Sequence, residues 1–99
     1  MVRNRESILG ILQDDGPILR RLGVRRLALF GSAARDELSP GSDLDFLVEL
    51  NAKTFDAYMT VKEHLEDRFA CRVDLVLRSA LKPELRDQIL AEALDAPLT

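Results

Sequence analysis

The sequence predicts a single α/β domain in which short strands alternate with amphipathic helices along one continuous chain. Strand-like and helix-like hydrophobic patterns follow one another, with no internal repeat and no low-complexity tract that would mark a linker. The 99 residues are 46% hydrophobic and 31% charged, a balance typical of a globular protein with a packed core. A chain of this length forms one small domain, residues 1–99, so any missing part of a binding site must come from a partner.

The net charge and the cysteine content indicate which partners and which cellular environment to expect. The formal net charge is -3, so we expect no overall basic field and no direct binding of long DNA or RNA. Cys71 is the only cysteine and cannot form an internal disulfide. Neither a secretory leader nor an apolar run of membrane-spanning length is present. We therefore expect a soluble, cytoplasmic protein that does not contact a membrane.

The first third of the chain predicts two helices and a strand. Asn4 is a suitable N-cap for a first helix that ends before Gly16. A short helical turn over residues 18–22 follows, and Gly23 ends it. Residues 24–30 are largely apolar and have the length of a strand, which predicts the first strand of the sheet.

The second predicted strand covers residues 44–50, where apolar and polar side chains alternate. This alternation puts Asp43 and Asp45 on one face of the strand and Leu44 with Phe46 on the other. Residues 39–42 read Ser-Pro-Gly-Ser, a turn sequence that places Asp43 at the start of the strand.

Two helices and a third strand complete the expected fold. Residues 55–69 carry apolar side chains at helical spacing, which predicts a helix laid on the sheet with the aromatic Phe55 and Tyr58 in the core. Residues 72–77 predict a third strand, far enough along the chain for a crossover and a parallel pair with the second. Pro83 suits the first turn of a last helix. The expected buried stripe of that helix is Leu85, Ile89 and Ala93.

A possible phosphate site follows the first strand, where Gly31 and Ser32 predict a sharp turn into a short helix. Glycine lets the backbone approach a phosphate without a Cβ in the way, Ser32 adds a hydroxyl, and free N–H groups favour negative charge. Arg35, or one of Arg25 and Arg26, would add a cation. Taken alone the pattern is weak evidence, because serine is an ordinary N-cap and glycine an ordinary turn residue.

Asp43 and Asp45 form an Asp-x-Asp pair whose charges repel one another. At about 4 Å and an effective dielectric constant near 20, two unit charges interact by roughly 4 kcal/mol, so the pair needs a cation, a proton or good solvation. Mg²⁺ prefers a few carboxylates together with phosphate oxygens and water. For the pair alone, a structural explanation is the simpler one: Asp43 caps the turn and Asp45 pairs with an arginine.

Asp74 interrupts the apolar third strand and adds weight to the metal hypothesis. If this strand pairs beside the second, and its register puts Asp74 on the same face, three acids meet at one edge of the sheet. Such a cluster is hard to explain by structure alone. Carboxylates of this kind can bridge two divalent ions about 3.5 to 4 Å apart, which stabilise both oxygens of an in-line phosphoryl displacement.

These residues resemble the motif of the polymerase β-type nucleotidyltransferase superfamily: Gly31 and Ser32, ten intervening residues, Asp43-x-Asp45, and Asp74 on a later strand. More closely, the chain is similar to the minimal nucleotidyltransferases over essentially its whole length. Further residues that carry the likeness are Ala34, Arg35, Ser42, Val73, Leu75 and Val76.

The resemblance implies a fold, a reaction and roles for named residues. The fold is a small mixed sheet of three or four strands flanked by helices. Asp43 and Asp45 would hold two Mg²⁺ ions, and Asp74 would complete one metal site and help to deprotonate the acceptor hydroxyl. Gly31 and Ser32 would hold the triphosphate. The remaining nucleotide-binding residues implied are Arg35 and Ser42. The expected reaction moves a nucleoside monophosphate from a nucleoside triphosphate to a hydroxyl and releases pyrophosphate.

The resemblance also implies a partner. Minimal nucleotidyltransferases resemble antitoxins that are encoded with a HEPN-domain ribonuclease toxin, and some attach AMP from ATP to a tyrosine of that toxin. The leading hypothesis is therefore an antitoxin that adenylylates its toxin within a hetero-oligomer. Two alternatives stay open: an antitoxin that neutralises the toxin by binding alone, and nucleotidyl transfer to a small molecule such as an aminoglycoside.

The chain departs from many relatives at Asp36, where they have glycine. An added negative charge near a triphosphate weakens its binding unless Asp36 points outward from the short helix. His64, the only histidine, is expected at a solvated or boundary position of its helix.

Overall fold

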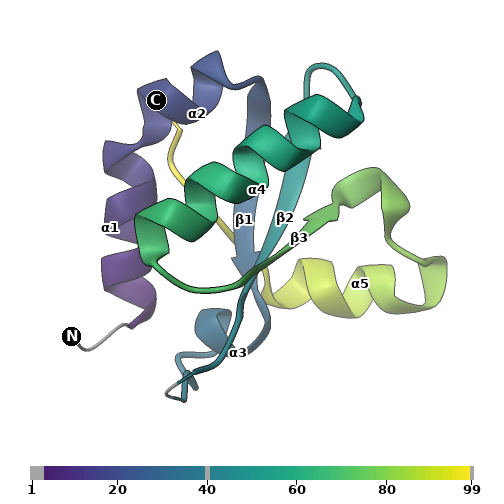
Figure 1. Ribbon diagram of the computed structural model, residues 1–99. Helices are drawn as coiled ribbons and strands as arrows, with labels where there is room; N and C mark the ends of the chain where they lie inside the picture. The colour runs from purple at the N-terminus through teal and green to yellow at the C-terminus, as the bar shows by residue number, and fades with distance from the viewer. Residues whose placement is uncertain (1–3, 40, 99) are drawn as a thin grey trace.

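A four-stranded mixed sheet lies at the centre of the molecule, with helices packed on it (Figure 1). The computed structural model describes residues 4–39 and 41–98, so Pro40 of the expected turn lies outside the described residues. In chain order the elements are α1 (Arg5–Asp14), α2 (Gly16–Arg21), β1 (Val24–Phe30), α3 (Gly31–Ala34), β2 (Leu44–Leu50), α4 (Phe55–Phe69), β3 (Val73–Leu77), the 3-10 helix η1 (Arg78–Ala80), α5 (Pro83–Glu92) and β4 (Leu94–Asp95). The expected α/β class is confirmed.

The strands lie in the order β3-β2-β1-β4. β2 runs antiparallel to β1 and parallel to β3, and α4 makes the crossover between the parallel strands. β4 pairs antiparallel with β1 through only two residues, Leu94 and Asp95. A segment this short carries no periodic pattern, so sequence analysis had no signal for it as a separate element.

Each face of the sheet has its own apolar cluster. The larger one joins α1, α2 and α4 to the sheet, with Leu12, Leu29, Phe46 and Leu65 all fully buried. On the other face, Ala28, Leu47 and Leu81 form a smaller cluster under α5. That second face is therefore the less covered one. Within the described chain, no helix has both the length and the apolarity needed to cross a membrane.

Two predictions about helix faces were wrong. Phe55, expected in the core, is 74% exposed, and Leu85 of the expected α5 stripe is 47% exposed. Each residue lies in the first turn of its helix, and the buried residues of α4 begin only at Val61 while α5 has none. Ile89 is half-buried against the smaller cluster. Tyr58 is half-buried as well, and its hydroxyl donates to the carbonyl of Leu75 at 2.6 Å.

Asp15, between α1 and α2, is a buried carboxylate that ties these helices to α4. It is 5% exposed, and it accepts from Nε of Arg68 at 3.1 Å. Nε2 of His64 lies 3.1 Å from the same carboxylate. The expected boundary position of His64 is confirmed, since its side chain is 23% exposed. Its partner was not foreseen, because no local pattern links residues 49 positions apart.

We expect Asp15→Asn to lower the free energy of unfolding by about 1 to 3 kcal/mol. The amide leaves Arg68 and His64 facing a buried position without a full negative charge. The matched control is Asp14→Asn, since Asp14 is exposed and its replacement should change stability by no more than about 0.5 kcal/mol. Urea unfolding followed by circular dichroism measures both. Equal midpoints for the two variants would contradict the prediction.

Candidate functional site

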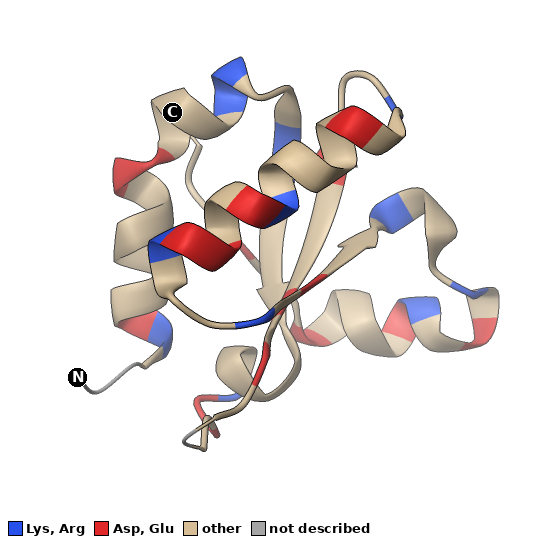
Figure 2. Ribbon diagram, in the orientation of Figure 1, with Lys and Arg blue, Asp and Glu red and all other residues tan. Residues whose placement is uncertain are grey.

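Three aspartates lie on the less covered face of the sheet, where β2 and β3 begin. Asp45 of β2 is in register with Asp74 of β3 in the parallel pair. Residues in register on adjacent strands project to the same face, and Asp43, two positions before Asp45, follows by alternation. The condition set by sequence analysis is therefore met. Figure 2 shows acidic residues gathering at this end of the two strands.

The electrostatics of Asp45 reflect this crowding. Burial raises the pKa of its carboxyl, and the charges of Asp74 and Asp43 raise the pKa further. Arg35 acts in the opposite direction. Among the described residues Asp45 forms no ion pair with an arginine, because Arg35 pairs with Glu37 and Glu92 instead, and its charge does not offset burial and like charge at Asp45. The face holds an excess of negative charge, which a hard cation would relieve.

We expect Asp45→Asn to stabilise the protein at pH 7 when no divalent cation is present. A raised pKa in the folded state means that the charged carboxylate costs stability above that pKa and nothing below the ordinary value of 3.8. The gain should be on the order of 1 kcal/mol or less, because solvent screens this half-buried group. Thermal unfolding in EDTA tests it: the advantage of the variant should shrink toward pH 4. A wild type that is the more stable protein at pH 7 contradicts it.

Gly31, between β1 and α3, lies directly against Asp45. The antiparallel register puts Phe30 opposite Asp45, so the next residue after β1 reaches the carboxylate. Gly31 has a φ of +72°, and a Cβ at this position would overlap Oδ2 of Asp45. Both observations require glycine, since the backbone conformation is left-handed and there is no room for a side chain. The Gly-Ser turn and the Asp-x-Asp pair are thus in contact.

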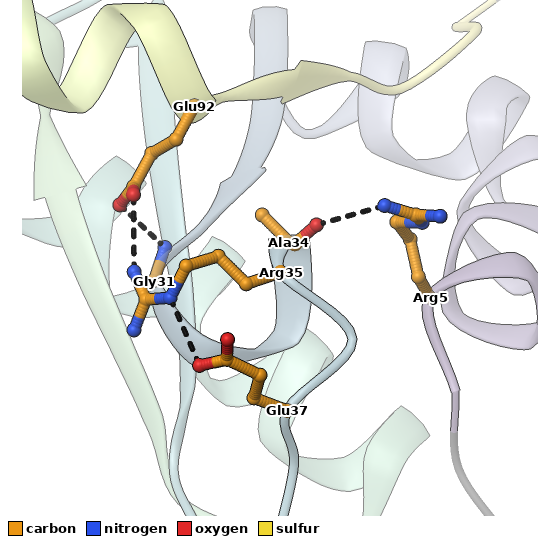
Figure 3. A network of polar contacts seen from close by, with 6 residues as sticks. All are labelled: Arg5, Gly31, Ala34, Arg35, Glu37 and Glu92. Atoms are coloured by element: carbon orange, nitrogen blue, oxygen red, sulfur yellow. Dashed lines mark hydrogen bonds and ion pairs between the residues drawn. The ribbon is translucent and has the colours of Figure 1, made fainter.

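Around Gly31 a polar network brings together residues from three segments (Figure 3). The N–H of Gly31 donates to Oε1 of Glu92 at 3.2 Å, and Nη1 of Arg35 donates to Oε2 of Glu92 at 3.0 Å. Nε of Arg35 also donates to Oε2 of Glu37 at 3.2 Å. The hydrogen bonds that Arg35 donates to Glu37 and Glu92 raise the pKa of its guanidinium, so this side chain remains a cation. Glu92 was missed by sequence analysis, because it lies 57 residues from Arg35 at the end of an unremarkable helix.

The two predicted serines make local contacts, Ser32 directly after Gly31 and Ser42 directly before Asp43. Ser32 is half-buried in α3, and its carbonyl accepts from the N–H of Glu37 at 2.8 Å. The hydroxyl of Ser42 accepts from the N–H of Ser39 at 3.2 Å, and this bond closes the turn before Asp43. Of the arginine pair named as a possible cation source, Arg26 is engaged elsewhere, with Asp95 at 3.3 Å.

Asp36 points away from the site. Its Oδ1 accepts from the N–H of Arg5 at 3.0 Å, which ties the start of α1 to the end of the short helix. Its φ of +59° lies in the left-handed region that favours glycine and that aspartate tolerates better than most residues. The expected penalty of an added charge near a phosphate is therefore small.

The aspartates do not form a finished metal cage. In residues 4–39 and 41–98, no group of three or more His, Cys, Asp or Glu side chains converges closely enough to hold a metal ion. Asp43 and Asp74 are exposed, and Asp45 is half-buried. An open set of carboxylate oxygens fits Mg²⁺, which is commonly bound by one or two carboxylates, water and the phosphate oxygens of a substrate.

A basic pocket of about 410 Å³ lies on the sheet around the other end of β2. Its charged lining residues are Arg25, Glu49, Lys53, Arg78 and Arg86. Glu49 is the acid among them, and it pairs with Arg78 at 3.4 Å and with Arg26 at 3.8 Å. Glu49 shares a strand face with Asp45 but belongs to this separate, positively charged region.

Comparisons with known proteins agree on one family of enzymes. The model of the nucleotidyltransferase domain family matches residues 6–96. A Methanocaldococcus jannaschii protein, provisionally named a protein adenylyltransferase, is 40% identical over 80 residues, which cover 80% of this chain and 86% of that protein. Protein adenylyltransferase MntA of Thermococcus cleftensis is 36% identical over 91 residues, which cover 90% of this chain and 92% of that protein.

Solved structures share the fold. One described provisionally as a minimal nucleotidyltransferase has a TM-score of 0.80 at 34% identity, covering 93% of this chain and 95% of that one. A second, a tri-AMPylated HEPN toxin of Shewanella oneidensis in complex with an MNT antitoxin, contains a chain with a TM-score of 0.58 at 22% identity. That match covers 97% of this chain and 71% of the other, and at this identity it reports the fold alone.

Proposed function

This chain belongs to the nucleotidyltransferase domain family, and from that membership we propose that it transfers AMP from ATP to a tyrosine hydroxyl of a HEPN-type toxin, and so acts as an antitoxin. The observation that carries the proposal is that Asp45 is in register with Asp74 across β2 and β3 and at the same time lies directly against the backbone of Gly31. It joins an acidic pair suited to Mg²⁺ with a glycine turn whose backbone N–H already donates to a carboxylate oxygen and could donate to a phosphate oxygen in its place.

Each side of the site has a role in this reaction. Asp43 and Asp45 would hold two Mg²⁺ ions, and Asp74 would complete one of the two sites. When bound, the metal ions supply charge neutralisation for the phosphates and activation of the acceptor hydroxyl. Asp74 is exposed at the start of β3, where it can accept the proton of an incoming hydroxyl.

The phosphate side of the site uses backbone and cationic donors. Gly31 and Ser32 would cradle the triphosphate, Arg35 would neutralise part of its charge, and Ser42 would fix the turn that presents Asp43. Catalysis in such a site is chiefly positioning and electrostatic stabilisation of the transferred phosphoryl group.

The names of the relatives support a protein as the acceptor of AMP. The two curated relatives at 40% and 36% identity carry the name protein adenylyltransferase. The Shewanella oneidensis structure pairs an MNT antitoxin with a HEPN toxin that carries AMP. The carboxylates of this chain lie on the less covered face of the sheet, where a protein surface can reach Asp43 and Asp74.

The test is to incubate the chain with α-labelled ATP, Mg²⁺ and the product of the adjacent gene, and then to locate the label. Label on a tyrosine of the partner supports the proposal. Neutralisation of the toxin without label, retained by Asp45→Ala, would instead indicate an antitoxin that acts by binding. Pyrophosphate release that depends on an aminoglycoside, with no labelled protein, would indicate a small-molecule acceptor.

A further inference from the structure

Glu92, the last residue of α5, already holds the donors that the triphosphate would need. One carboxylate oxygen accepts from the N–H of Gly31 and the other from Nη1 of Arg35, at 3.2 and 3.0 Å (Figure 3). Two oxygens of one anion bound by a backbone N–H and a guanidinium reproduce the way proteins hold a phosphate group. In the structure, these two donors at the Gly31 turn therefore hold an anion that belongs to the chain itself.

The carboxylate of Glu92 lies among other carboxylates, whose negative charges repel it. It lies close enough to Asp45 to raise the pKa of that carboxyl, on a face that also carries Asp43 and Asp74. The contacts with Gly31 and Arg35 offset this repulsion. A triphosphate would bring a stronger negative charge to the same place, and the single N–H of Gly31 cannot serve both anions.

We propose that Glu92 is an intramolecular competitor of the nucleotide: its carboxylate fills the phosphate subsite of the free protein and must leave when a nucleoside triphosphate binds. This inference rests on the proposed function, because it takes the turn at Gly31 as the triphosphate site. It assigns to the end of α5 a regulatory contact that sets nucleotide affinity.

The attachment of α5 allows such a release. No residue of α5 is buried, and Ile89 and Leu90 are only half-buried against the smaller apolar cluster. Moving the end of this helix, or turning the Glu92 side chain alone, therefore exposes little apolar surface. Arg35 would stay beside the turn after Glu92 leaves, because Glu37 holds its Nε at 3.2 Å.

The expected consequence is a reduced apparent affinity for nucleotide. A protein whose binding-competent state is partly populated binds more weakly by that fraction, and removing the competitor restores the intrinsic value. For a partly exposed carboxylate we expect Glu92→Ala and Glu92→Gln to lower the Kd for Mg·AMP-PNP roughly threefold to tenfold. Inorganic tripolyphosphate should show the same order, since the competition concerns phosphate and not the base.

The experiment is titration calorimetry on the full 99-residue chain, with Glu84→Ala as the matched control. Glu84 lies in the first turn of the same helix and is exposed, and its side chain makes no hydrogen bond or ion pair with any other residue that the structure describes. Its removal changes net charge equally and should leave the Kd unchanged. Unchanged or weaker binding in both Glu92 variants overturns the inference while leaving the proposed function standing. Failure of wild type and variants alike to bind any nucleoside triphosphate overturns both.

A second measurement covers the case in which the Glu92 variants do not fold. In wild type, saturation with tripolyphosphate should shift the NMR signal of the Glu92 side-chain carboxyl carbon and of the Gly31 amide together, because the bond between them breaks. A shift at Gly31 with no change at Glu92 overturns the inference.

Discussion

Asp45→Ala is expected to abolish nucleotidyl transfer, with a loss of about 10³-fold or more in rate, while the chain stays folded. Asp45 is the half-buried member of the acidic set, in register with Asp74 and in contact with Gly31. Asp45→Ala removes a carboxylate that is a proposed Mg²⁺ ligand and that also lies against the Gly31 turn, the proposed triphosphate site. Metal and oxyanion contacts of this kind act mainly on the transition state, so kcat should fall with kcat/KM.

Single-turnover transfer of labelled AMP to the partner, at saturating Mg²⁺, measures this loss. The matched control is Glu49→Gln, which removes a carboxylate from the same face of the same strand, four residues further on, where it pairs with Arg26 and Arg78. Transfer by this control should stay within about threefold of wild type. Equal losses in the two variants would mean that general charge, and not the position of Asp45, matters.

The local parts of this site could be predicted because each depends on a few neighbouring residues. The alternation over residues 44–50 fixed the shared face of Asp43 and Asp45, and the strand, glycine and serine order indicated the turn at Gly31. The distance between the Gly31 turn and the aspartate pair could not be predicted from such local patterns. It depends on the antiparallel register of β1 with β2, which puts Phe30 opposite Asp45 and which no short pattern states.

The residues that sequence analysis missed or misplaced share one cause, which is dependence on distant contacts. Glu92 reaches Gly31 across 61 residues, and only the packing of α5 brings it there. Helical periodicity assigned Phe55 and Leu85 to apolar stripes, but it does not say where the sheet beneath a helix ends. Without that limit, periodicity cannot distinguish an exposed residue in the first turn of a helix from a buried residue one turn later.

Gly31→Ala is expected to impair both stability and transfer, and its two effects can be separated. The left-handed backbone, with φ of +72°, costs a residue with a Cβ about 1 to 2 kcal/mol. The added methyl group would also overlap the carboxylate of Asp45, which must then move. A displacement of about 1 Å at a reacting centre lowers the rate by roughly 10²-fold, so transfer should fall by at least that factor.

Gly23→Ala separates these effects, because Gly23 also has a positive φ, of +94°, but has open space where its Cβ would lie. The two variants should lose comparable stability through backbone strain, measured by urea unfolding, and only Gly31→Ala should lose transfer at temperatures where both are folded. If Gly23→Ala loses transfer as severely, strain in the fold explains the effect. A Cβ at position 31 must displace the carboxylate of Asp45, because the two would occupy the same space. A Gly31→Ala protein that transfers AMP at the wild-type rate would therefore mean that the observed position of Asp45 against this turn is not needed for transfer.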